Sequence, residues 1–214
     1  MPGRNLCRMF PRATLLNTFR RPKGVVMALT PSTMVPLGTP CPTFHLPDVS
    51  SGQPLSLESF KNKDVLLVMF LCRHCPYVVH VQAELARIGR EYAARGVAVV
   101  AISANDAAQY PDDGPVGLRR QASEQGFAFP YLYDDSQAVA KAFGAACTPD
   151  FFVYDANRQL VYRGQLDDSR PGNGKPVTGR DLRAALDAAL AGRPALEPQR
   201  PSAGCNIKWK SSGR

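Results

Sequence analysis

Two uninterrupted apolar runs mark the centre of the chain, VLLVMFL at 65–71 and VAVVAIS at 97–103. Runs of this length are typical of strands that are covered on both faces. Between them, apolar residues recur three and four positions apart, which predicts a helix over about 75–94. Its inner stripe consists of Val78, Val81, Leu85, Ile88 and Tyr92. The pattern therefore predicts a strand, a helix and a second strand.

Shorter segments extend this alternation. They are a hairpin around the turn 50–54, a helical turn at SLESF, a polar loop at 105–115, a helix at GLRRQASEQG, a helix at 136–144 with Ser136 as cap and Gly144 as stop, a hairpin of FFVYD and QLVYR, and a last helix that opens at Thr178 with Asp181 as capping partner. Alternating strands and helices predict an α/β fold with a central, mainly parallel sheet. The late hairpin adds an antiparallel edge, so the sheet is mixed.

Positive charge is concentrated at the amino terminus. The chain has 26 basic and 18 acidic residues, and six of the basic residues precede the first acid, Asp48, within 1–26. The remainder is close to neutral, which argues against a nucleic-acid partner. No apolar run approaches the ~20 residues of a membrane span, so we expect no membrane partner either.

Changes in composition divide the chain into a basic extension at 1–26, a domain at 27–192 and a Pro-containing tail at 193–214. The extension is interpreted as disordered or as non-native sequence upstream of a start at Met27. A basic arm and an organelle transit segment are the alternatives, because it is Arg-rich and free of acids. It lacks the apolar stretch of a secretory signal. We expect a cytoplasmic protein, or an organellar one if the extension is a transit segment.

Six cysteines are scattered along the chain, and Cys72 and Cys75 form a CxxC pair within CRHC. The others are Cys7, Cys41, Cys147 and Cys205. Six is too sparse for a secreted scaffold held by disulfides. A CxxC directly after a buried strand, at the start of the next helix, is the thioredoxin-like arrangement.

The chemistry of this pair follows from its expected position. The free N–H groups of a helix amino terminus favour a thiolate at Cys72, and Arg73 and His74 add positive charge, so we predict a lowered pKa and a reactive nucleophile. Cys75, further in and partly buried, is predicted to resolve a mixed disulfide. Two structural cysteines and two metal ligands are the alternatives. Zinc takes four ligands and a second CxxC is absent, so we expect no metal and no cofactor.

Four stretches carry a family resemblance: CRHCPY, ACTPDFF, RGQLDDSRPGNGKPVTG and GCNIKWK. With these, residues 30–210 resemble the peroxiredoxin-like (redoxin) branch of the thioredoxin superfamily. The resemblance implies a thioredoxin-like fold with an amino-terminal hairpin and an extended carboxy-terminal tail. It also implies a cis peptide bond between Thr148 and Pro149, facing the CxxC, where the Thr148 backbone pairs with a bound peptide strand.

Two positions depart from the family pattern. Peroxiredoxins have a threonine hydroxyl three residues before the reactive cysteine, where this chain has Met69, which puts fast peroxidase activity in doubt. Thioredoxin has a buried aspartate six residues before its nucleophile, where this chain has Leu66. A base for Cys75 would then be water, or Asp167 or Asp168 if their loop folds over the site.

Four further features have two interpretations each. Cys147 is a small buried side chain or a redox thiol, and Cys205, near Trp209, is a free tail cysteine or a third thiol. The loop 167–175 is a solvated connection or a rim that shapes access. His80 lies off the inner stripe of its helix and is expected at the surface.

These observations together predict an enzyme, a thiol–disulfide oxidoreductase that uses Cys72 and Cys75. Its substrate would be a protein or small-molecule disulfide, and an external thiol would supply electrons. The first alternative is a thiol peroxidase that reduces hydroperoxides through a Cys72 sulfenic acid. The second is a protein that binds a metal or cluster through the same cysteines.

Overall fold

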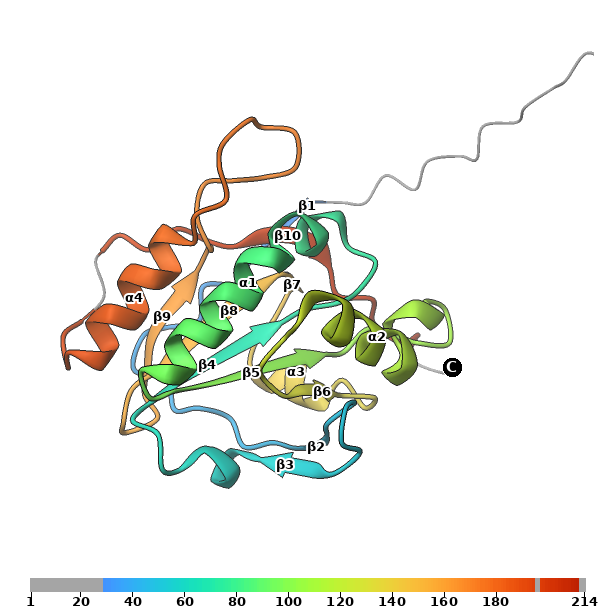
Figure 1. The fold of residues 1–214 in the computed structure, drawn as a ribbon, viewed down its shortest axis with the longest axis horizontal. Helices are drawn as coiled ribbons and strands as arrows, with labels where there is room; N and C mark the ends of the chain where they lie inside the picture. Colours follow the sequence, from blue (N-terminus) through green and yellow to red (C-terminus); the bar gives the residue numbers. More distant parts are fainter. Residues whose placement is uncertain (1–28, 195–196, 212–214) are drawn as a thin grey trace, which may run out of the picture.

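A five-stranded sheet forms the centre of the computed structural model, which describes residues 29–194 and 197–211 (Figure 1). Its strands, in spatial order, are β6 (Tyr131–Tyr133), β5 (Val97–Ser103), β4 (Val65–Phe70), β8 (Asp150–Tyr154) and β9 (Leu160–Gly164). The pairs β6–β5 and β5–β4 are parallel, and β4–β8 and β8–β9 are antiparallel. The predicted mixed sheet is confirmed, with parallel and antiparallel neighbours in equal number. The predictions for 1–26 and for Cys7 lie outside the described residues.

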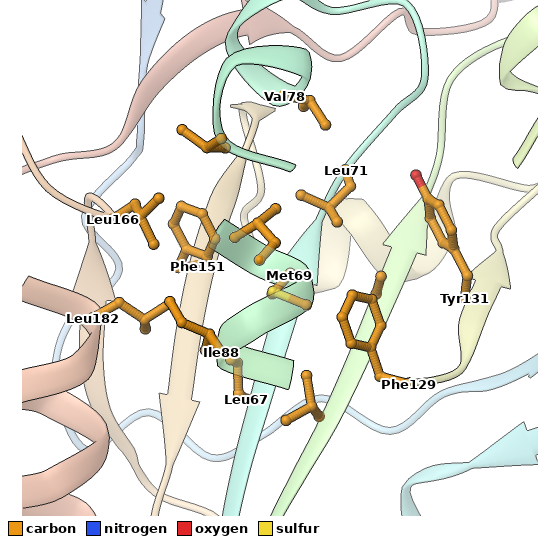
Figure 2. Packing of buried hydrophobic residues seen from close by; sticks show 14 of the residues in the cluster. Leu67, Met69, Leu71, Val78, Ile88, Phe129, Tyr131, Phe151, Leu166 and Leu182 are labelled. Atoms are coloured by element: carbon orange, nitrogen blue, oxygen red, sulfur yellow. The ribbon is translucent and has the colours of Figure 1, made fainter. Parts of the chain in front are cut away.

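Three helices cover one face of this sheet: α1 (Pro76–Ala94), α2 (Pro115–Gln125) and α4 (Arg180–Leu190). Because side chains alternate along a strand, every second residue of β4 points toward these helices. Figure 2 shows Met69 in this core, with Leu182 and Phe151 to one side and Phe129 and Tyr131 to the other. The predicted inner stripe of the helix at 75–94 is buried here.

The opposite face is covered by smaller elements: β2 (His45–Pro47), β3 (Pro54–Ser56), the 3₁₀ turn η1 (Leu57–Phe60) and α3 (Ala138–Ala142). Strands β2 and β3 form the predicted hairpin. Phe143, directly after α3, packs edge-on against Phe70 and Phe152, with ring centroids 5.4 and 5.9 Å apart. This face has its own hydrophobic core, which contains Cys41.

The carboxy-terminal segment is part of the fold. Strand β10 (Ala203–Asn206) lies between β1 (Leu29–Pro31) and β7 (Cys147–Thr148), antiparallel to both. Beyond it, the Ile207 amide donates a hydrogen bond to the Ala146 carbonyl. The tail therefore joins the first described residues to the segment in front of β8. None of the helices described within 29–194 and 197–211 has the length and apolarity to cross a membrane.

Two predicted cap residues are wrong, and one strand was missed. Helix α3 begins after Gln137 and α4 after Gly179, so neither Ser136 nor Thr178 is the cap residue. The Ser136 and Thr178 hydroxyls still accept from the Ala138 and Arg180 amides. A buried aspartate accepts at each helix start as well, Asp134 from the Ala140 amide and Asp167 from the Gly179 amide. In addition, β6 was not predicted. A three-residue strand, YLY, is too short to establish a periodicity. The polar loop at 105–115 is confirmed as the connection to α2, with one 3₁₀ turn, η2 (Pro111–Asp113).

Candidate active site

The CRHC motif lies in the connection between β4 and α1. The helix begins at Pro76, whose ring favours the first helical position, and Cys75 is therefore the N-cap residue. Cys72 lies three residues earlier, in the loop. The sequence analysis assigned the helix amino terminus to Cys72, although its predicted helix began near residue 75, and the structure places Cys75 there.

Thr148 brings the two thiols of the motif to one place. Its hydroxyl lies 3.2 Å from the Cys72 sulfur, and its carbonyl oxygen lies 3.2 Å from the Cys75 sulfur. The peptide bond from Thr148 to Pro149 is cis. Both sulfurs are buried, with an exposed fraction of 0% for each cysteine.

A third thiol completes the cluster. The sulfur of Cys205 lies 2.6 Å from that of Cys75, and Cys205 is also buried. Strand β10 sets this position, because Cys205 is opposite Thr148 in the β10–β7 register. Of the two interpretations of Cys205, a free tail cysteine and a third thiol, the structure matches the second. The sequence left both interpretations open, because no local pattern decides a contact between residues 130 positions apart.

The pKa values of the thiols shift in opposite directions. Burial raises the pKa of Cys72, and its hydrogen bond to Cys75 adds to this effect. Hydrogen bonds from Cys205 and Cys72 lower the pKa of Cys75, and they outweigh the effect of its burial. The structure therefore contradicts the prediction of a lowered pKa at Cys72. The stabilised thiolate is the N-cap cysteine, where the helix amino terminus also favours negative charge.

Arg73 and His74 direct their charge away from the sulfurs. The Arg73 guanidinium donates to the Gly117 carbonyl and pairs with Glu124 at 3.2 Å. The His74 ring pairs through Nδ1 with Asp113. The expected electrostatic effect of both residues on Cys72 is therefore largely neutralised by acids.

Asp113 is the functional residue that the sequence analysis missed. Its buried carboxylate accepts hydrogen bonds from the backbone amides of Arg73 and His74 at 2.8 and 3.2 Å, from the His74 ring and from the Asn105 side chain at 2.7 Å. It thereby fixes the loop between the two cysteines. In the sequence it lies in a polar loop beside Asp112, which is exposed, and no pattern distinguishes the two.

The same network bears on metal binding. One ligand atom each from Cys72, His74 and Asp113 lies within 4.8 Å of the others. Three ligands are one fewer than a closed zinc site needs. The Asp113 carboxylate is also already occupied by several N–H donors, which a metal ion would have to displace. The donor set fits a hydrogen-bonded loop better than a metal centre.

Several other candidates are placed outside the thiol cluster. Cys147 is buried, with its thiol directed at the Pro149 carbonyl at 3.6 Å, and burial raises its pKa. His80 is half-buried and bonds Ser169 of the loop 167–175, which is therefore attached to α1 and is not purely solvated.

Asp167 and Asp168 form their hydrogen bonds and ion pairs with residues outside the thiol cluster. Asp167 is buried and accepts from the Thr178 and Gly179 amides. Asp168 forms ion pairs with Arg180 and Arg200. These contacts provide no base for Cys75, so the geometry does not support that role.

The two positions that depart from the family pattern are core residues. Met69 and Leu66 are both completely buried, on opposite faces of the sheet. Neither can supply the hydroxyl or carboxylate that relatives have there. Thr148 is the residue that places a hydroxyl against Cys72.

The mixed sheet, the covering helices and a CxxC at the strand–helix junction define a protein of thioredoxin-like fold. The comparisons agree with this class. A family model described as Redoxin matches residues 36–182, and the chain belongs to the Redoxin family. A search of curated proteins finds no match.

Solved structures support the same placement. An uncharacterized conserved protein from Geobacillus kaustophilus is 54% identical, with a TM-score of 0.85 over 87% of this chain and 99% of that one. A hypothetical protein from Sinorhizobium meliloti is 51% identical, with a TM-score of 0.84 over 86% of this chain and 100% of that one. A thiol:disulfide interchange protein from Chlorobium tepidum is 23% identical, with a TM-score of 0.56 over 72% and 97% of the chains, and supports the fold alone.

Proposed function

We propose that this protein is a thiol–disulfide oxidoreductase in which Cys72 attacks a disulfide substrate and Cys75 resolves the intermediate. The observation that carries the proposal is the convergence of both sulfurs on Thr148, each at 3.2 Å from one of its oxygens. Redoxin membership and the thioredoxin-like fold support a redox enzyme. An external thiol supplies the electrons, because thiol–disulfide exchange with the Cys72–Cys75 disulfide restores both thiols of the pair.

The directions of the pKa shifts suggest how the reaction starts. The pKa of Cys72 is raised and that of Cys75 is lowered, so Cys72 holds its proton more tightly than Cys75 does. When this proton passes to Cys75, the Cys72 thiolate attacks the substrate disulfide, forms a mixed disulfide and expels one substrate thiolate, which takes the proton. Cys75 then attacks the sulfur of Cys72 and expels the second thiolate. Two electrons reach the substrate, and a Cys72–Cys75 disulfide remains.

Access for the substrate is proposed from the side of the CRHC loop. A hollow beside it is lined by His74 and residues 109–112. The His74 ring stacks on Tyr110 with centroids 5.0 Å apart, which forms an aromatic wall. Because both sulfurs are buried, a substrate has to displace part of this wall to reach Cys72. A protein or small-molecule disulfide satisfies the chemistry of this site.

The test is a disulfide-reduction assay with a dithiol as electron donor. Cys72→Ser should abolish the activity, and Cys75→Ser should accumulate a mixed disulfide between Cys72 and the substrate. Cys41→Ser is the matched control, because Cys41 is buried on the other face of the sheet, away from the cluster. A Cys72→Ser variant with full activity would exclude the proposed nucleophile.

A thiol peroxidase is the second candidate, and one observation favours it. The Thr148 hydroxyl beside Cys72 is in a position to orient a hydroperoxide, although it comes from another segment than the threonine of peroxiredoxins. Cys72 would take one oxygen as sulfenic acid and release an alcohol or water, and Cys75 would condense with it to a disulfide and water. Stopped-flow peroxide consumption by the reduced protein tests this. A rate no faster than that of a free thiol would reject it.

A further inference from the structure

The Cys75 sulfur has two thiol neighbours on two different segments. Cys72 precedes it in the CRHC loop and is hydrogen-bonded to it, and Cys205 reaches it from strand β10. We propose that Cys205 is the terminal thiol of a three-cysteine relay, so that the oxidised resting enzyme holds a Cys75–Cys205 disulfide and a free Cys72. This inference rests on the proposed function, since it begins from the Cys72–Cys75 disulfide.

The separation of the sulfurs supports direct exchange. The sulfur atoms of Cys75 and Cys205 lie 2.6 Å apart. This is shorter than a van der Waals contact between two sulfur atoms and little longer than the ~2.05 Å of a covalent disulfide. Both thiols are buried, so exchange between them does not compete with water or with thiols in solution. A small movement of one side chain is enough to form the bond.

The backbone holds Cys205 in place on both sides. Its strand pairs with β1 at Leu29 and with β7 at Thr148. The strand can approach this closely because residue 204 is glycine, and a Cβ there would lie 2.0 Å from the Thr148 carbonyl oxygen. A thiol fixed by two strand neighbours has a high effective concentration at its target, unlike a thiol on a free tail.

The relay step balances without any further reactant. The Cys205 sulfur attacks that of Cys75 in the Cys72–Cys75 disulfide, the bond to Cys72 breaks, and the proton of Cys205 passes to the released Cys72 thiolate. No electrons enter or leave, so the protein remains oxidised by two electrons. The consequence is functional: Cys72 becomes free again and can form a mixed disulfide with a second substrate while Cys75 and Cys205 remain linked.

Cys147 provides a comparison within the same region. It lies next to Thr148 and is as buried as the cluster, but its thiol is directed at the Pro149 carbonyl. The relay therefore includes Cys205 and leaves out Cys147. Cys147→Ser is a matched control, because it removes a buried thiol one residue from Thr148 without touching the Cys75–Cys205 contact.

The test is disulfide mapping on the full chain. The reduced protein is oxidised with one equivalent of diamide, free thiols are alkylated, and the protein is digested with trypsin without reduction. Cleavage after Arg73 separates Cys72 from Cys75, and Cys147 and Cys205 fall on two further peptides, so each linkage has its own mass. We expect the Cys75–Cys205 pair to be the main linkage, with Cys72 alkylated, in the wild type and in Cys147→Ser.

Substitution of Cys205 gives the second readout. Cys205→Ser and Cys205→Ala should both lose this linkage and accumulate the Cys72–Cys75 pair. They should also lose the capture of a second substrate on Cys72. A main linkage of Cys72 to Cys75 in the wild type, with Cys205 alkylated, would overturn the relay and leave the proposed function intact. No linkage among the three cysteines would overturn both, and the wild-type result does not depend on how the variants fold.

Discussion

Asp113 and Asp150 are both completely buried beside segments that hold the thiols, yet their pKa values shift in opposite directions. Burial disfavours ionisation of Asp113, but hydrogen bonds from His74 and Asn105 outweigh it and lower the pKa. For Asp150 burial dominates and raises the pKa to about 7. Burial is common to both residues, so the number and quality of the donors decides which form is stable.

The hydrogen bonds explain the difference. Asp113 accepts from two loop amides and two side chains. Asp150 accepts a long bond of 3.4 Å from the Ala146 amide through Oδ2, and its Oδ1 has no partner in the part of the chain that the structure describes. The CRHC loop is thus held by a stable carboxylate, whereas the segment around Pro149 carries an acid that changes its charge near neutral pH.

The largest effect on the free energy of unfolding is expected from Asp150→Asn, because an amide cannot ionise as the buried carboxyl group does. Because the folded-state pKa of about 7 lies above the unfolded value of about 3.9, the folded protein holds the extra proton and loses stability as pH rises between these values. The loss amounts to on the order of 4 kcal/mol above pH 7 and vanishes below pH 4. Urea unfolding at several pH values should therefore find Asp150→Asn more stable than the wild type at pH 8 and equal to it at pH 4.

If the free energy of unfolding changed with pH in the same way in the wild type and in Asp150→Asn, the raised pKa of Asp150 would be contradicted. It would mean that another group titrates, or that Asp150 is ionised in the folded protein with donors that the structure does not contain. The comparison with Asp113 would then lose its physical basis.

A somewhat smaller effect is expected from Asp113→Ala, which leaves buried donors without an acceptor. We expect a loss of about 3 kcal/mol in the free energy of unfolding, together with faster alkylation of Cys72 as its loop loosens. Since the pKa of Asp113 is lowered, this contribution is present above the unfolded value of about 3.9 and is lost as pH falls through the folded value. Asp112→Ala, at the exposed neighbour, should stay within about 0.5 kcal/mol of the wild type.

Much of the fold could be predicted from residue patterns. The apolar runs of β4 and β5 and the stripe of α1 are long and regular, so a single periodicity identifies each of them. The strand β10 has no such pattern: AGCN is short and largely small or polar, and its place is decided by the gap between β1 and β7. The position of such a strand is set by contacts with segments that are distant in the sequence, and a local residue pattern does not contain this information.

The candidate site, like the fold, could be predicted from the sequence only in part. CRHC and the Thr148–Pro149 pair were visible because each is a compact motif with a known chemical use. Asp113 and the position of Cys205 were not, because each acts through residues that are distant in the sequence, 40 positions for the Arg73 amide and 130 for Cys75. The direction of the Cys72 pKa was wrong for a related reason: charged neighbours can be read from the sequence, but burial and the acids that neutralise them cannot.

The smallest effect is expected at Thr148, whose hydroxyl contacts Cys72 directly. Burial raises the pKa of Cys72, and the Thr148 hydroxyl acts in the opposite direction. Thr148→Val keeps the shape but removes the hydroxyl, so the thiolate loses a hydrogen bond of about 1 kcal/mol and alkylation of Cys72 should slow about fivefold. Thr148→Ser retains the hydroxyl and should restore the rate. If Thr148→Ser slowed as much as Thr148→Val, the retained hydroxyl would not be enough to set the rate, and its proposed part in tuning Cys72 would be rejected.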